Sequence, residues 1–546
     1  MQFKFPVSYT SKKMTLQKHI IDDMELVSLN GQNDFTDSIY DKLFKPKHIL
    51  SKNVLIELVK EYSYDKKFLK DTQKIIKEYN PPKFDESFDK VYQEWDDIKK
   101  TKNFKDFYNY YIWKIFEPLN NNDTALEFLT IYTLSSPVFS LLLPIFMLIV
   151  PFLIIKIRGL QLSLSEYYSI IMALLKNHSL GRALTSFNGA DINKKAYLIF
   201  SVFFYFFSIY QNIITCVRFT KNIRKIYNTL FMFKEYLEIA SSKMECFMAV
   251  IIKRKTYNAF YNDIKSNKEV LDTFLTELKK LQPLKINIKC LKQLGFTMNQ
   301  FYQLYSNTKY ETAIQYSFDC VGYMDIIENF PKLAKCNFSK KTNINKMTYP
   351  VTKDAVKNNI VLDKPIILTG PNASGKTTIL KSTLINILLS QQFGFGCFQS
   401  ADIKLYKFIH SYLNIPDTSG RDSLFQAEAR RCKEIIDCIQ KNKSDNHFCI
   451  FDELYSGTNP EEAIISANAF MNYISTNVNV DCILTTHYIE LCKLLKTCIN
   501  YKMDTKQTNN NFEYTYTIVP GISDVKGGIK ILNDMNYPKE ILEKMK

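Results

Sequence analysis

The sequence predicts two regions of different fold class. We expect an α/β domain with a mostly parallel sheet from about residue 341 to 546, preceded by an α-helical region that carries two transmembrane helices. Three observations support this prediction. Apolar strands alternate with helical patterns in the C-terminal region, as in a parallel sheet that is covered on both faces. A glycine-rich loop of the phosphate-binding type follows the first of these strands. Two long stretches nearer the N-terminus contain no charged residue.

The size and composition of the chain limit its number of domains, its partners and its compartment. Its 546 residues are enough for roughly two to four domains. The net charge of +16 suits an anionic partner, either nucleic acid or a phospholipid surface, although AT-rich codon usage explains part of the lysine excess. The twelve cysteines form no C-x-x-C pair, which favours reduced thiols in a protein exposed to the cytosol. The N-terminal residues are polar and mixed in charge, so we do not expect secretion.

Changes of pattern along the chain predict four segments. They are a helical N-terminal region (1–125), a segment with the two uncharged stretches and the loop between them (126–218), a second helical region (219–340) and the α/β domain (341–546).

The two uncharged stretches are residues 128–155 and 196–217. Each is long enough to cross a hydrocarbon layer of about 30 Å. The competing interpretation is a pair of buried core helices, but such helices seldom remain uncharged over more than about twenty residues. Six Lys or Arg in the loop 156–195 fit poorly with the positive-inside tendency, whereas the basic residues after 217 fit it well, so the topology stays open. We expect a membrane-associated protein whose α/β domain faces the cytosol, the nucleoplasm or a viral factory.

The segment 366–382 predicts a buried strand, a tight loop and a helix. Gly370, Gly375, Lys376 and Thr377 fit the pattern G-x-x-x-x-G-K-[ST], in which backbone N–H groups and the helix N-terminus face phosphate oxygens. Lys376 can then reach the β- and γ-phosphates of ATP, and the Thr377 hydroxyl can ligate Mg²⁺. A chance match is the alternative. The residues expected to contact the nucleotide here are Gly370, Pro371, Asn372, Ala373, Ser374, Gly375, Lys376, Thr377 and Thr378.

Two more apolar strands end in residues with the chemistry of ATP hydrolysis. The strand in HFCIFDEL ends at Asp452 and Glu453, which we assign to Mg²⁺ and to the catalytic base that polarises water. The strand in CILTTHYIE ends before His487, at the sheet edge where open α/β folds bind ligands. We expect His487 to sense or stabilise the γ-phosphate, although a lone histidine is more often structural. The segment 422–431 predicts only a helix start that Ser423 can cap.

Together these motifs resemble the ATPase domain of the MutS mismatch-repair family. The matching residues are Thr369 to Asn372 (TGPN), Asn358 in VKNN, Ser423, Leu424, Phe425 and Glu428, then Asp452, Glu453, Gly457 and Thr458, Thr486 to Leu491 (THYIEL), and the hairpin-like segment 512–530. The resemblance is strong over 350–540, moderate over 290–350 and weak before that. It implies that Asn358 contacts the nucleotide. It also implies a homodimer with composite ATP sites, in which Ser423 faces the γ-phosphate of the partner, and it implies DNA as a ligand.

The chain departs from the family in three respects. The family's mismatch-recognition motif is matched only by a tripeptide at 84–86, and the chain looks too short for recognition and connector domains. Tyr455 and Ser456 replace the usual Gly-Arg. The uncharged stretches fall where the family has lever and clamp helices. These departures argue against mismatch reading and leave ATP hydrolysis intact. In these respects the chain resembles the divergent, truncated MutS-like proteins of large DNA viruses and some bacteria.

The function expected from the sequence is that of a MutS-like ATPase that binds DNA, including mismatched DNA, in mismatch repair or a related maintenance role without its own mismatch-recognition domain. One alternative is a membrane-anchored ABC-type ATPase. It requires an L-S-G-G-Q signature before the Asp-Glu strand, where this chain has SLFQAEARR. The other alternative is a scaffold that uses ATP as a dimer switch and has no role on DNA.

Overall fold

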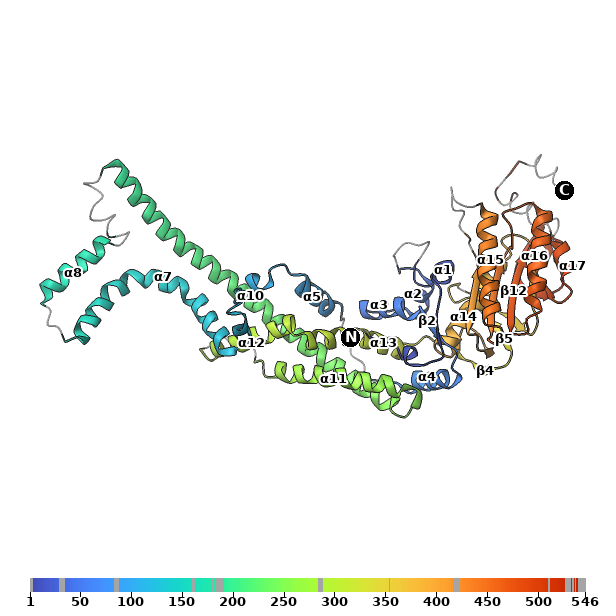
Figure 1. The fold of residues 1–546 in the computed structure, drawn as a ribbon, viewed down its shortest axis with the longest axis horizontal. Coiled ribbons are helices and arrows are strands. Elements are labelled where there is room, and N and C mark those ends of the chain that lie inside the picture. Colours follow the sequence, from blue (N-terminus) through green and yellow to red (C-terminus); the bar gives the residue numbers. More distant parts are fainter. Residues whose placement is uncertain are drawn as a thin grey trace. The chain divides into compact units, whose positions relative to one another are not determined.

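The computed structural model divides into two compact units (Figure 1). It describes residues 3–28, 35–82, 88–159, 163–177, 191–282, 288–352, 354–413, 423–508 and 511–525, with a few single residues besides. The first unit comprises Met1–Asp89, Ala240–Lys268 and Gln315–Lys546, and the second comprises Lys90–Ile239 and Glu269–Ile314. Each unit therefore gathers segments that are distant in sequence.

A six-stranded sheet forms the centre of the first unit. Its strands, in spatial order, are β10 (Phe408–Tyr412), β11 (His447–Asp452), β12 (Val480–Thr486), β7 (Ile366–Thr369), β13 (Ile499–Thr508) and β14 (Asn511–Pro520). Neighbouring strands are parallel except for β13 and β14, which form an antiparallel hairpin. The mostly parallel sheet agrees with the prediction. All four residues of β7 are buried, as expected for a strand covered on both faces.

Helices that follow the strands cover this sheet (Figure 1). They are α14 (Lys376–Gln392), α15 (Leu424–Lys441), α16 (Pro460–Ser475) and α17 (Ile489–Leu494). Apolar side chains of α15 and α16 form one cluster with those of β11 and β12. Every residue of α14 from Ser382 to Gln392 is buried, because the N-terminal part of the chain also packs on this helix. Gln391 and Gln392 donate to the carbonyl oxygens of Ser63 and Val59 at 3.2 and 3.3 Å.

Smaller sheets and short helices complete the first unit. One sheet has the order β4 (Asn337–Ser339), β9 (Ser400–Lys404), β5 (Thr342–Met347) and β6 (Asn358–Leu362), and two strand pairs are β1 (Lys13–Thr15) with β2 (Glu61–Ser63) and β3 (Ala334–Lys335) with β8 (Phe395–Gly396). The N-terminal helices are η1 (Pro6–Tyr9), α1 (Lys18–Asp23), α2 (Ile39–Phe44), α3 (Ile49–Leu58) and α4 (Lys66–Glu78), and η3 (Lys255–Tyr257) follows later. The expected mostly helical character of the N-terminal region is present, together with the short β1–β2 pair.

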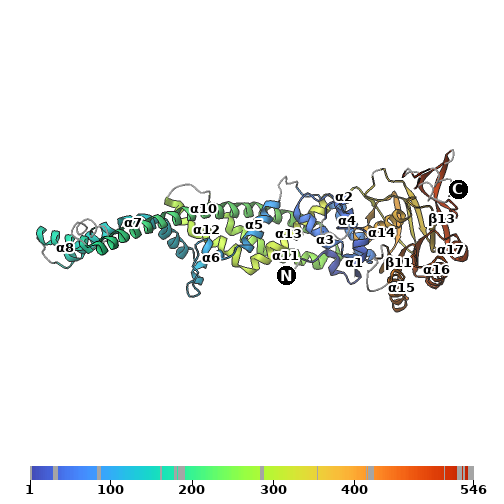
Figure 2. The ribbon, with the colours of Figure 1, turned by 90° about the horizontal axis from the view of Figure 1, so that it is seen from above.

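The second unit is helical (Figure 2). Its elements are α5 (Asp89–Lys100), α6 (Phe104–Phe107), η2 (Glu117–Asn121), α7 (Asp123–Ile157), α8 (Leu164–Asn177) and α12 (Ile288–Ser306), with parts of α10 (Ile192–Ile251), α11 (Asn258–Lys279) and α13 (Thr308–Glu328) that continue into the first unit. Aromatic side chains fill its core. The Phe104 ring stacks on Tyr305 with centroids 3.7 Å apart, and Trp95 packs on Phe233 at 6.0 Å.

The two uncharged stretches lie in α7 and α10. Both helices contain a window apolar and long enough to cross a membrane, one within Asp123–Leu142 and one within Ile192–Ile251. Only 17% and 11% of these windows are buried within the chain, which does not fit the alternative of two buried core helices. The helices are joined by hydrogen bonds, since Asn212 donates to Ser140 Oγ at 2.6 Å. By length and composition, α7 and α10 are therefore candidate membrane spans. The tripeptide 84–86 and residues 526–530 lie outside the described residues.

Candidate active site

The loop between β7 and α14 places a lysine at the start of a helix. Gly375 precedes α14 with a left-handed backbone (φ 95°), which glycine adopts without strain. Lys376 is buried, and its Nζ donates to the carbonyl oxygens of Gly370 and Pro371 at 3.0 and 3.2 Å. Ser374 Oγ also donates to the Pro371 carbonyl, at 2.7 Å. The loop thus folds around the ammonium group of Lys376.

The end of β11 faces the start of α14. Thr377 Oγ1 donates to Asp452 Oδ2 at 2.8 Å, and Thr485 Oγ1 donates to Asp452 Oδ1. Thr485 lies directly opposite Asp452 on the neighbouring strand β12. Three strand or helix ends therefore meet at one edge of the sheet, and they bring together the hydroxyl and carboxylate oxygens that the sequence assigned to a metal.

Glu453, His487 and Lys376 form a second cluster at the same edge. Glu453 Oε1 lies 2.7 Å from His487 Nε2, which also lies 3.2 Å from Lys376 Nζ. The hydrogen bond from His487 lowers the pKa of the Glu453 carboxyl group, although burial opposes the shift. Burial lowers the pKa of Lys376, and the charges of Glu453 and Asp452 oppose this. Because Nε2 holds either a proton or a lone pair, His487 donates to Glu453 or accepts from Lys376, but not both at once.

A cavity of about 660 Å³ opens beside this cluster, a volume in the range of small-molecule sites. The expected site residues that line it are Asn358, Asn372, Ala373, Gly375, Lys376, Thr377, Thr378 and Glu453. The others are not part of its described lining: Gly370, Pro371, Ser374, Ser423, Asp452 and His487. Of these, Asp452 and His487 bond directly to lining residues, as given above.

Asn358 has a structural role that the sequence did not suggest. It lies at the start of β6, and its side-chain amide bonds to the backbone of β14 on both sides. Nδ2 donates to the Tyr516 carbonyl at 3.0 Å, and Oδ1 accepts from the Ile518 N–H at 2.8 Å. The amide therefore holds the C-terminal hairpin beside the cavity, while its contact with a nucleotide stays a prediction.

Ser423 is the N-cap of α15, as its sequence context predicts. Its Oγ accepts from the Gln426 N–H at 3.3 Å, and Gln426 Oε1 accepts from the Ser423 N–H at 2.9 Å. Ser423 is exposed. The helix start therefore presents this residue at the surface of the chain.

Glu428 is a site residue that the reasoning from motifs left without a role. It is 2% exposed, although it carries a carboxyl group. Its oxygens accept from Ser456 N and Ser456 Oγ at 3.1 and 3.0 Å and from Gly457 N at 3.2 Å. Glu428 thus binds the loop that follows Asp452 and Glu453 to α15. It shares the buried face of α15 with Cys432 and Ile435, four and seven residues later, so a carboxylate on the apolar face of this helix was the available signal.

The parallel sheet, with its polar residues gathered at the strand ends, is typical of α/β proteins that bind ligands at that edge. The family model for MutS domain V matches residues 366–546. A DNA mismatch repair protein MutS from Fusobacterium nucleatum is 26% identical over 348 residues, which are 59% of this chain and 37% of that protein. One from Parabacteroides distasonis is 28% identical over 265 residues, 43% of this chain and 30% of that protein.

These comparisons confirm the resemblance to the MutS family that the motifs indicate, and the matching family model, MutS domain V, covers residues 366–546. A third relative, from Streptococcus pyogenes, is 28% identical over 200 residues, 35% of this chain and 23% of that protein. The matched segments span well under half the length of these curated relatives.

Proposed function

We propose that the chain binds ATP in the 660 Å³ cavity and hydrolyses it in a MutS-type reaction. The observation that carries this proposal is the convergence of Lys376, Glu453 and His487 through contacts of 2.7 and 3.2 Å at the edge of a parallel sheet. Lys376 supplies positive charge for the β- and γ-phosphates, and the N-terminus of α14 adds its dipole.

The donor set beside this cluster suits Mg²⁺. Asp452 and Thr377 present carboxylate and hydroxyl oxygens 2.8 Å apart, and hard oxygen ligands are what this ion prefers. These two residues would hold the ion, directly or through water. When bound, Mg²⁺ neutralises charge on the phosphate oxygens. Asp452 is positioned for this by Thr485, which donates to its other oxygen.

Glu453 is the proposed general base. Its carboxylate lines the cavity and its lowered pKa keeps it ionised, so it can accept a proton from an attacking water. His487 orients this carboxylate when its Nε2 carries the proton. When Nε2 carries a lone pair instead, it accepts a hydrogen bond from Lys376 Nζ. His487 therefore links the base to the phosphate-binding lysine.

ATP turnover by the purified full chain tests the active site. Lys376→Ala is expected to lower turnover by at least about a hundredfold, because a positioned donor to a developing charge is lost. Lys381→Ala, on the same helix, is the matched control and should keep wild-type turnover. Undiminished hydrolysis by Lys376→Ala would show that the assignment is wrong.

The second part of the proposal is a homodimer in which Ser423 completes the ATP site of the partner. The exposure of Ser423 at the start of α15 supports it. A mixture of Lys376→Ala and Ser423→Ala tests it. Each variant alone should be inactive, whereas a mixed dimer has one complete site, so an equal mixture should regain about a quarter of wild-type turnover. If Ser423 acted within its own chain, mixing would restore nothing.

We also propose that the protein acts on DNA, as the names of the relatives state for those proteins. The net charge of +16 supports contact with a phosphate backbone. Binding to matched and mismatched duplexes at several salt concentrations tests this. A preference for the mismatch at every salt concentration would indicate mismatch recognition, and equal binding would indicate backbone contact alone. Absence of binding to either duplex would exclude the DNA role.

Finally, we propose that α7 and α10 anchor the protein in a membrane with the ATP site on the cytosolic side. The mostly exposed apolar windows in the two helices support this. Carbonate extraction of membranes from expressing cells tests it, since an integral protein stays in the pellet. Release of the full chain into the soluble fraction would exclude the anchor.

A further inference from the structure

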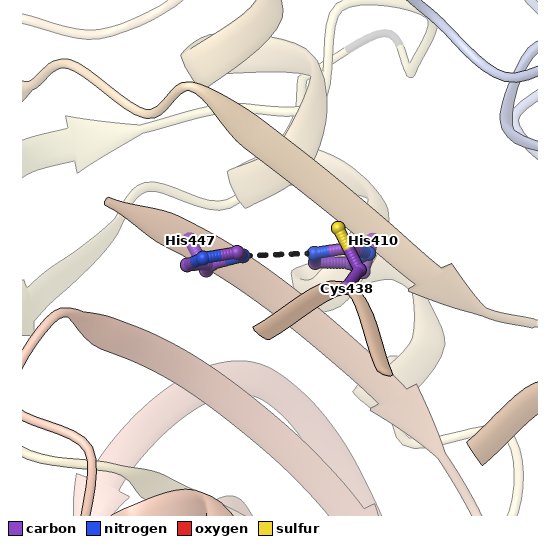
Figure 3. A group of neighbouring side chains, drawn as sticks. All are labelled: His410, Cys438 and His447. Carbon is purple, nitrogen blue, oxygen red and sulfur yellow. Dashed lines mark hydrogen bonds between the residues drawn. The ribbon is translucent and has the colours of Figure 1, made fainter. Parts of the chain in front are cut away.

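Two histidines and a cysteine meet on one face of the sheet (Figure 3), and none of them lines the proposed ATP site. His410 Nε2 and His447 Nδ1 lie 3.1 Å apart. Each of the residues His410, Cys438 and His447 offers one ligand atom, and the three atoms lie within 4.8 Å of one another. Both histidines are almost fully buried and Cys438 is half-buried.

The fold explains why these residues meet. His410 lies on β10 and His447 begins the neighbouring parallel strand β11. The register pairs Phe408 with His447 and His410 with Cys449, so the two imidazoles are diagonal neighbours on one face. Helix α15 covers that face, because its side chains cluster with Cys449, and it supplies Cys438. The three ligand atoms therefore come from three separate elements of the rigid core.

The distances approach those of a coordination shell. Ligand atoms around a tetrahedral zinc ion lie roughly 3.3–3.8 Å apart, given bond lengths of about 2.0–2.3 Å. The histidine nitrogens at 3.1 Å must separate slightly, and because all three atoms lie within 4.8 Å of one another, the thiol needs to approach by at most about 1.5 Å. We expect the half-buried Cys438 side chain to make that movement by adjusting its rotamer.

A second hydrogen bond prepares His447 as a ligand. Its Nε2 lies 3.1 Å from the Asn442 carbonyl oxygen, to which it can only donate. The proton is therefore on Nε2, and the Nδ1 lone pair faces His410. Metal-bound histidines commonly have such a carbonyl partner, which fixes the tautomer and the ring orientation.

We propose that His410, Cys438 and His447 form a binding site for Zn²⁺ or a similar thiophilic divalent cation. Imidazole and thiolate ligands suit this class of ion, whereas Mg²⁺ prefers oxygen. On binding, His447 gives its Nδ1 lone pair. The Nε2 proton of His410 moves to Nδ1 of the same ring, so that Nε2 becomes a ligand. The Cys438 thiol releases its proton to solvent, so one proton leaves per ion bound.

A small cavity of about 30 Å³ adjoins the cluster, and His410 and Cys438 line it together with His19. This volume is enough for a water molecule. Arg431 and Glu434 also line it, and they are paired at 3.7 Å, so Glu434 offsets part of the positive charge of Arg431. Water in this cavity is thus available as the fourth ligand.

The position of these three residues suits a structural metal site and not a catalytic one. His447 is the first residue of β11, whereas Asp452 ends the same strand. Bound metal would join β10, β11 and α15, the helix whose N-cap is Ser423. It would therefore stabilise the sheet and fix α15 without touching the proposed ATP site.

Cobalt titration of the metal-free, reduced full chain tests the proposal. Co²⁺ replaces Zn²⁺ in such sites, and a Cys–Co²⁺ bond gives a near-ultraviolet charge-transfer band. We expect this band in the wild-type protein, its displacement by Zn²⁺, and a Zn²⁺-dependent rise in melting temperature. Cys438→Ser should abolish the band, and His410→Asn should weaken affinity at least about tenfold.

Two matched controls locate the ion. Cys246→Ser removes another half-buried thiol and should keep the band. Asp452→Asn alters the proposed Mg²⁺ site and should also keep it. Cys438 is half-buried on a helix, so its replacement by serine is compatible with folding even if His410→Asn is not. No charge-transfer band in the wild type, or an unchanged band in Cys438→Ser, would overturn the proposal.

Discussion

Glu453 Oε1 lies 2.7 Å from His487 Nε2, although the two residues follow different strands of the sheet. The parallel pairing of β11 with β12 places Asp452 opposite Thr485, so the residues just after the two strand ends become neighbours. The carboxylate and imidazole are therefore held by the register of the sheet, and both can be altered without disturbing the buried strands.

Replacing the carboxylate tests the proposed base. Glu453→Gln should lower ATP turnover by about 10²- to 10⁴-fold, because the amide cannot accept the proton of water. Nucleotide affinity should remain close to wild type, since Lys376 and the loop are intact. Single-turnover hydrolysis and equilibrium binding of a fluorescent ATP analogue measure the two effects. Glu490→Gln, on the exposed side of α17, is the control. Equal turnover in Glu453→Gln and wild type would exclude Glu453 as the base.

The His487 contact predicts a pH dependence. His487 holds the pKa of Glu453 below its usual range, so the carboxylate form persists to lower pH. His487→Ala removes this hydrogen bond, and the pKa of Glu453 should rise. The acid limb of the kcat–pH profile should then move to higher pH, whereas His48→Ala should leave it in place. The same contact stabilises the fold above the unfolded-state pKa, and that contribution is lost as pH falls through the folded-state pKa. An unshifted acid limb would refute the coupling.

The bond between Thr377 and Asp452 predicts a change in metal dependence. Thr377→Val keeps the shape of the side chain but removes the hydroxyl that lies 2.8 Å from Asp452. The Mg²⁺ concentration for half-maximal turnover should rise at least about tenfold. Thr383→Val removes a hydroxyl from the same helix that bonds only to the Ile379 carbonyl in the described structure, so it serves as the control. Mg²⁺ titrations of both variants and the wild type measure this effect. Equal Mg²⁺ concentrations at half-maximal turnover would argue against Thr377 as a ligand.

The buried carboxylate of Glu428 predicts a loss of stability. Glu428→Ala leaves the donors of Ser456 and Gly457 without their acceptor, which should cost about 1–3 kcal/mol. Glu434→Ala removes a largely exposed carboxylate from the same helix and should change stability by less than about 0.5 kcal/mol. Urea unfolding of both variants gives the comparison. If the two variants unfold alike, the Glu428 contacts contribute nothing to stability.

Features that depend on neighbouring residues were predictable from the sequence. The strand, loop and helix around Lys376, the end of β11 at Asp452 and the Ser423 cap all follow from local patterns, and each is present. Their convergence was also expected, because parallel strands direct their carboxyl ends to one edge. The N-terminal region (1–125) was expected to be helical, but α3 ends at Leu58 and residues Glu61–Ser63 pair with β1 instead.

Features that depend on distant residues were not predictable. The spacing of His410, Cys438 and His447 carries no metal-binding pattern, because strand register and helix packing bring them together. The burial of α14 by residues near 59–63 likewise depends on segments more than 300 positions apart. Asn358 matched a family motif, but the motif gave no indication that its amide would bond to β14.

The three hydrogen bonds of Glu428 also connect two functions. They hold α15, whose N-cap is Ser423, against the loop after Glu453. A movement of this helix would therefore move the loop as well. In the proposed dimer, Ser423 serves the partner while Glu453 serves its own subunit. Nucleotide bound at one site would then alter affinity at the second, and thermodynamic reciprocity requires an equal effect in the opposite direction. If nucleotide at one site lowers affinity at the other, this helix and loop would make the two sites fill in turn.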